Sequence, residues 1–145
     1  MTNEVGVRGI DHFNLDVPPE HLDTVCAFYE NAVGLKNGFR PIFDFDGRWL
    51  YADGIDNAVV HLASYGVNEP APLQQTSGRL NHICFAMQGL NDHRSRLTSQ
   101  GIAFRESDRP GAVVVQLFLQ DPTGVTIELN FSKALEGLPL PEATA

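Results

Sequence analysis

The sequence predicts an α+β fold built from two similar modules, each made of a strand, a helix and a β-hairpin. Both modules open with a strand pattern whose third residue is histidine, Ile10-Asp11-His12 and Leu80-Asn81-His82. A helical pattern closed by a glycine follows in each, and then a hairpin around a turn that begins with aspartate, Asp53 or Asp121. Equivalent positions lie 67 to 70 residues apart, which indicates an internal repeat.

Module one is predicted at about residues 8–64, and its first strand at residues 9–16. The pair Pro18-Pro19 ends this strand and opens a helix, because proline is tolerated in a first helical turn. Apolar residues then recur at helical spacing up to Gly34, a typical residue after a helix end; they are Leu22, Val25, Cys26, Tyr29 and Val33. Strand patterns at 49–52 and 58–63 flank Asp53-Gly54 and predict a hairpin.

Module two is predicted at about residues 79–131, after a linker at 65–78 that is rich in Pro, Gly, Asn and Gln. It repeats the order of module one: a strand at 80–86, a weaker helical pattern at 89–100, and strands at 113–119 and 125–131 around Asp121-Pro122-Thr123-Gly124. Residues 132–145 form a tail with two prolines. We expect residues 1–145 to fold as a single domain.

Composition excludes several classes of function. An apolar fraction of 43% without a long apolar run argues against a membrane partner, and the first residues lack the features of a secretion signal, so a cytoplasmic location is expected. Two cysteines, Cys26 and Cys84, make a disulfide framework improbable. A net charge of −8 and a pI near 4.9 argue against binding a nucleic-acid backbone.

Four residues in the strands carry the predicted chemistry. The repeat maps His12 onto His82 and His61 onto Glu128, and each lies on the strand face opposite the bulky aliphatic residues. If the modules pack with twofold pseudo-symmetry, three imidazoles and one carboxylate converge. That set suits a divalent metal such as Zn, Ni, Co or Fe(II).

Each of these residues also has a structural interpretation. A single strand histidine is more often a satisfied core or surface residue than a ligand. Glu128 has possible ion-pair partners in Arg48, Arg79 and Arg105. Two further histidines in helical segments, His21 and His93, are expected to be solvated. The aromatic residues of 43–51 are expected to form core or dimer contacts, and their second interpretation is a wall for a flat apolar substrate. Arg40 and Arg48 are candidates for binding a substrate carboxylate.

The chain resembles the vicinal oxygen chelate superfamily, also called the glyoxalase/bleomycin resistance/extradiol dioxygenase group, across residues 9–131. The pieces that carry the resemblance are Ile10-Asp11-His12, Phe28-Tyr29 followed by Val33-Gly34-Leu35, Leu80-Asn81-His82-Ile83, and the run from Asp121 to Leu129. The resemblance implies two βαβββ modules that form an incomplete mixed β-barrel around a metal, with His12, His61, His82 and Glu128 as ligands. Glyoxalase I members usually have Glu or Gln at the position of His61. Extradiol and fosfomycin-resistance members use the counterparts of His12, His82 and Glu128, and bleomycin-binding members have lost the ligands.

Three functions are therefore open. The first is a divalent-metal-dependent lyase or isomerase of the glyoxalase type that holds adjacent oxygens of a small substrate and stabilises an enolate, with Glu128 or His61 as base. The second is an Fe(II) extradiol-type dioxygenase, and the third is a non-catalytic small-molecule binding or resistance protein. A homodimer is expected from the resemblance and from the exposed sheet edges of an open half-barrel. The sequence leaves open whether each site lies within one chain or across two.

Overall fold

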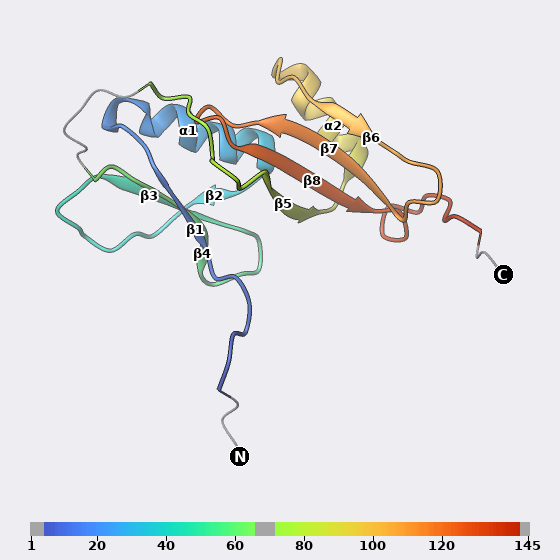
Figure 1. Ribbon diagram of the computed structural model, residues 1–145, viewed down its shortest axis with the longest axis horizontal. Helices are drawn as coiled ribbons and strands as arrows, with labels where there is room; N and C mark the ends of the chain where they lie inside the picture. The colour runs from blue at the N-terminus through green and yellow to red at the C-terminus, as the bar shows by residue number, and fades with distance from the viewer. Residues whose placement is uncertain (1–4, 66–71, 143–145) are drawn as a thin grey trace.

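Two four-stranded mixed sheets form the frame of the computed structural model, which describes residues 5–65 and 72–142 (Figure 1). Sheet A has the order β1-β4-β3-β2, and sheet B has the order β5-β8-β7-β6. The pairs β1–β4 and β5–β8 are parallel, and the remaining pairs in both sheets are antiparallel. Neither sheet is closed, so the α+β fold with an incomplete barrel that the sequence predicts is confirmed.

The elements of sheet A come from the first half of the chain. Its strands are β1 (Phe13–Asp16), β2 (Lys36–Asn37), β3 (Gly47–Tyr51) and β4 (Ala58–Ala63). Between β1 and β2 run a 3₁₀ turn η1 (Pro19–His21), helix α1 (Leu22–Phe28) and a π-helical turn η2 (Tyr29–Val33). The helical segment ends at Gly34, whose φ of 94° places it in the left-handed region that glycine adopts without strain.

The elements of sheet B come from the second half. They are β5 (His82–Met87), α2 (Leu90–Ser99), β6 (Arg105–Ser107), β7 (Val114–Gln120) and β8 (Thr126–Ser132). Figure 1 shows the two sheets in different halves of an elongated molecule, with α1 running from sheet A toward sheet B. Among the described residues, none of the helices has both the length and the apolar character of a membrane span.

One apolar core joins the two halves. Ile127, Leu129 and Phe131 of β8 are fully buried, as are Val60 and Leu62 of β4, because alternation along each strand sends these residues to the same face. The opposite face carries His61 in β4 and Thr126, Glu128 and Asn130 in β8. The helical segment of module one contributes Tyr29, which is also fully buried and packs against Phe13 in this core. The core therefore lies on one face of β4 and β8, while His61 and Glu128 lie on the opposite faces of these strands, next to the aromatic residues Trp49 and Phe118.

A buried hydrogen bond links the two halves. The Tyr29 hydroxyl donates to Asp121 Oδ2 over 2.5 Å, and Asp121 is only 3% exposed. The other carboxylate oxygen, Asp121 Oδ1, accepts the backbone N–H groups of Thr123 and Val125 at 2.9 Å each. These bonds explain why the turn between β7 and β8 begins with aspartate. The carboxylate organises the turn and bonds it to the helical segment 92 residues earlier.

His93 is buried, and the prediction that it is solvated is wrong. It lies on α2 three residues after Leu90 and four before Leu97, so all three share the buried face of the helix. Its ring packs near that of Phe131, with centroids 5.7 Å apart. Burial lowers the pKa of His93 below its ordinary value and favours the neutral imidazole.

The segment after β8 is bonded to module two. The Glu136 carboxylate accepts the backbone N–H groups of Gly89 and Leu90 at 2.8 and 3.0 Å, and it thereby caps the N-terminus of α2. The Lys133 N–H donates to the Val113 carbonyl at 2.9 Å, and the Lys133 ammonium lies 2.7 Å from Asp108. Helix α2 is thus stabilised by a residue that follows the last strand.

Candidate metal centre

His12 and His61 lie together on the polar face of sheet A, and we call them donor pair one. His61 is on β4, opposite Trp49 of β3. Its ring stacks between those of Trp49 and His12, with centroid distances of 4.2 and 3.8 Å. Burial and then the neighbouring His12 lower the pKa of His61, so its imidazole is preferentially neutral and retains a free lone pair.

His82 and Glu128 lie together on the polar face of sheet B, and we call them donor pair two. His82 Nε2 is 3.1 Å from Glu128 Oε2. The Gln116 side-chain amide donates to Glu128 Oε1, and the carboxylate is 5% exposed. Glu128 therefore has a histidine and an amide as partners, and the arginine partners considered above are not among its contacts in the described residues.

A hydrogen bond fixes the orientation of one histidine in each donor pair. His12 Nδ1 donates to Asp11 Oδ1 over 2.7 Å, and His82 Nδ1 donates to Asn81 Oδ1 over 2.8 Å. Each acceptor is the residue directly before its histidine, so the two contacts are equivalent in the repeat. Because Nδ1 carries the proton, Nε2 is left as the ring nitrogen that binds other groups. A hydrogen bond to the second ring nitrogen is the arrangement that orients metal-bound histidines.

The contact between His82 and Glu128 places a ring nitrogen beside a carboxylate oxygen. With its proton on Nδ1, a neutral imidazole presents a lone pair at Nε2, and a carboxylate oxygen also only accepts. Two acceptors at 3.1 Å repel each other unless a proton or a metal ion lies between them. Three imidazoles and one carboxylate are suitable ligands for a divalent first-row metal, so the residues present fit such an ion.

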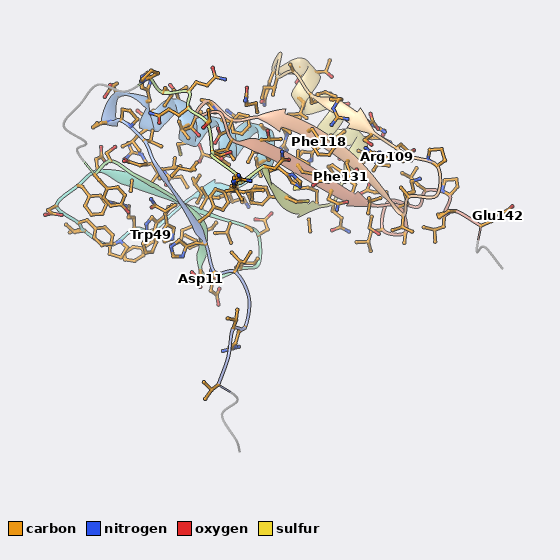
Figure 2. The ribbon with its side chains drawn as sticks, in the orientation of Figure 1. Asp11, Trp49, Arg109, Phe118, Phe131 and Glu142 are labelled. Atoms are coloured by element: carbon orange, nitrogen blue, oxygen red, sulfur yellow. The ribbon has the colours of Figure 1, made fainter. Side chains whose placement is uncertain are left out.

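The chain does not bring its two donor pairs together. Within residues 5–65 and 72–142, no three His, Cys, Asp or Glu side chains lie close enough to hold a metal ion. The physical reason is the shared core: contacts such as that between Phe13 and Phe85, with ring centroids 6.2 Å apart, join the apolar faces of the two modules. Figure 2 shows Asp11 and Trp49 in the region of sheet A and Phe118 in the separate region of sheet B.

Other predicted residues have structural partners. Arg48 pairs with Asp23 and Asp46 at 3.0 and 2.9 Å, which occupies its guanidinium. The Arg40 guanidinium lies over the rings of Phe43 and Phe45, at 4.7 and 5.1 Å from their centroids. Arg40 therefore packs on the aromatic segment before β3, whereas Arg48 bonds β3 to α1.

Cys84 follows His82 on the same face of β5. Burial and then the nearby Glu128 raise the pKa of its thiol to about 11, so at neutral pH it is a thiol and a poor nucleophile.

Three residues of this region were not predicted as site residues. Asp11 and Asn81 were detectable, because each directly precedes a repeat histidine and has a side-chain oxygen. Gln116 was not, because its contact with Glu128 depends on the register between β7 and β8, in which Phe118 lies opposite Glu128.

Comparisons with known proteins relate the sequence to one protein family and the structure to the fold of that family's members. A profile of the Glyoxalase/Bleomycin resistance protein/Dioxygenase superfamily matches residues 9–129. An Arabidopsis thaliana protein described as Glyoxylase I 4 is 29% identical over 142 residues, which are 95% of this chain and 79% of the plant protein.

Solved structures of other proteins share the fold. A glyoxalase family protein from Bacillus anthracis has a TM-score of 0.66 and 23% identity, with 90% of this chain and 99% of that one covered. TnmS3, an antibiotic binding protein from Streptomyces sp. CB03234, has a TM-score of 0.63 and 18% identity, with 89% and 99% covered. At these identities the likeness to the two structures establishes the fold alone.

Proposed function

Because the chain belongs to the Glyoxalase/Bleomycin resistance protein/Dioxygenase superfamily, we propose that it is a divalent-metal-dependent lyase or isomerase of the glyoxalase type. The observation that carries the proposal is the presence of a donor pair at equivalent positions on the polar face of each sheet, each with an oriented histidine. The likeness to the plant protein described as Glyoxylase I 4 supports the choice of chemistry.

The proposed metal site lies between two copies of the chain. Donor pair one of one copy, His12 and His61, meets donor pair two of the other, His82 and Glu128, so that a homodimer with twofold symmetry contains two sites. The separation of the pairs within one chain supports this arrangement. The first strand of each module, β1 or β5, also lies at an unpaired edge of its sheet, and Val5, Val7 and Ile10 before β1 are fully exposed. Pairing these edges between copies would bury them.

The chain's own residues would hold the substrate and move its proton. A metal ion at this site would polarise two adjacent substrate oxygens and stabilise the negative charge of an enolate. Asp11 and Asn81 keep the Nε2 atoms of His12 and His82 directed to the site, and Gln116 holds Glu128 through Oε1. Glu128 would serve as the base that removes the proton next to the carbonyl if substrate binding frees its carboxylate from the metal, and neutral His61 is the alternative base.

Subunit mixing tests the proposed site. His12→Ala and Glu128→Ala should each lose bound metal and activity without unfolding. If sites lie between copies, each mixed dimer contains one intact site, so an equal mixture should recover about one quarter of the wild-type metal. A site within one chain predicts no recovery on mixing, and full metal occupancy in Glu128→Ala would refute the ligand set. Plasma mass spectrometry of the reconstituted proteins measures the metal.

A second function is favoured by one specific observation. The His61 ring is enclosed between those of Trp49 and His12. If this stacking keeps His61 off the metal, His12, His82 and Glu128 form the two-histidine, one-carboxylate set of Fe(II) oxygenases. Oxygen consumption with catechol by anaerobically iron-loaded protein would select this function. Ligand binding that is unchanged by removing the metal would instead select a non-catalytic binding protein.

A further inference from the structure

A cleft of about 480 Å³ opens on sheet B beside donor pair two. The strand register places four residues in one row across the sheet, from β5 to β6: Cys84, Glu128, Phe118 and Arg105. Residues directly opposite on adjacent strands point to the same face, so Arg105 lies on the polar face that carries Glu128. Arg105 and Phe118 line the cleft together with Asn81, Phe104, Gln120 and Thr126.

Arg105 is an uncompensated positive charge in this cleft. Its guanidinium lies 4.5 Å from the centroid of the Phe118 ring, which orients it. It makes no ion pair among residues 5–65 and 72–142, because the two nearest acidic residues in sequence have other partners: Glu106 pairs with Arg94, and Asp108 with Lys133. The residues that line the cleft include no carboxylate, although the chain has a net charge of −8.

We propose that Arg105 binds the anionic end of the substrate and that the substrate is an organic carboxylate with an apolar body. This inference rests on the proposed function, since it places the adjacent oxygens of the same substrate at donor pair two. Two strand spacings separate Glu128 from Arg105, which puts their backbones roughly 10 Å apart.

A substrate that bridges this distance has adjacent oxygens at one end and a carboxylate at the other. Its middle part lies against Phe118, whose ring is between the two residues in the row. The planar guanidinium suits a carboxylate because it offers two parallel N–H donors. The cleft volume is within the range of small-molecule sites.

A pair of probes of the same shape and different charge tests the proposal. Both 3,4-dihydroxybenzoate and 3,4-dihydroxybenzamide present adjacent oxygens, and only the first carries an anion at the opposite end. Cobalt-loaded protein is titrated with each by calorimetry, after its metal content has been measured. The wild type should bind the benzoate roughly tenfold to a hundredfold more tightly than the benzamide.

Two arginine variants separate local recognition from general charge. Arg105→Gln should remove the preference for the benzoate and leave benzamide binding and metal content unchanged. Arg109→Gln removes the same charge from an exposed position outside the cleft, labelled in Figure 2, and should keep the preference. Equal binding of the two probes by the wild type, or a preference that survives Arg105→Gln, would overturn the proposal.

The same measurements show separately whether the carboxylate-binding role of Arg105 fails and whether the proposed metal site fails. Normal metal content without a charge preference rejects the role of Arg105 and leaves the proposed function standing. If no metal binds, benzoate and benzamide are compared by NMR titration of the metal-free protein. A benzoate preference that depends on Arg105 would then support the cleft and reject the metal site, and its absence would reject both.

Discussion

Replacing Tyr29 by phenylalanine should destabilise the protein by about 2 to 3 kcal/mol. The substitution removes only the hydroxyl that donates to Asp121 Oδ2, and both residues are buried. A hydrogen bond to a charged group contributes about 1.5 to 3 kcal/mol, and the carboxylate oxygen left behind has no access to water that would replace it. The expected loss is therefore at the upper end of this range.

Tyr51 provides a matched control. Its hydroxyl also donates, over 2.6 Å, but the acceptor is the Phe39 carbonyl at the exposed surface. Water can replace that donor, so Tyr51→Phe should cost less than about 1 kcal/mol.

Urea unfolding at one fixed protein concentration measures both variants, with Trp49 as the only tryptophan and far-UV circular dichroism as the second probe. Because m-values of small proteins are about 1 to 3 kcal/mol/M, Tyr29→Phe should lower the midpoint by roughly 1 M. Equal losses in the two variants would refute the argument that burial makes the bond to Asp121 strong.

Three further predictions concern other parts of the fold. In Gly124→Ala the new Cβ would lie 2.3 Å from the Gln75 carbonyl oxygen at a backbone φ of 98°, so the free energy of unfolding measured by chemical denaturation should fall by about 3 kcal/mol. In the control Gly111→Ala the backbone φ is 80° but no atom lies near the new Cβ, so the free energy of unfolding should fall by only about 1 kcal/mol. Burial lowers the pKa of His93 in the folded chain, so the unfolded chain takes up a proton at a higher pH than the folded chain does. The contribution of neutral His93 to the free energy of unfolding should therefore be fully present above pH 6.5 and should be lost as the pH falls below it. The free energy of unfolding should depend less on pH in this range in His93→Gln. Glu136→Ala should cost about 1 kcal/mol and speed amide exchange at Leu90, whereas unchanged exchange there would contradict the capping role.

The regular elements were predictable because their patterns are local. The alternation of aliphatic residues predicted strands at 58–63 and 125–131, and the structure has β4 and β8 there. The observed strand β1 is shorter than the predicted strand at 9–16. It begins at Phe13, which pairs with Val60, and residues 9–12 run past the first residues of β4. The strands β2 and β6 have two and three residues, too few to show a period, so no local pattern located them, although the resemblance implies a fourth strand in each module.

The candidate site was predictable in residue type and strand face, but not in its assembly. Repeat position alone singled out His12, His61, His82 and Glu128, and the structure groups them as two pairs. How the modules pack depends on contacts between residues far apart in the sequence, such as Tyr29 with Asp121, and no local pattern contains that information. For the same reason, the row from Glu128 to Arg105 became visible only with the strand register.

The shared core also has a consequence for communication between sites. The buried bond from Tyr29 to Asp121 and the shared core link the two modules of a chain, and donor pair one lies on one module and donor pair two on the other. In the proposed dimer each chain therefore belongs to both sites at once. Any small rotation of a chain that tightens one site displaces its ligands at the second, so we expect binding at the two sites to be cooperative, with a sign set by the direction of that rotation.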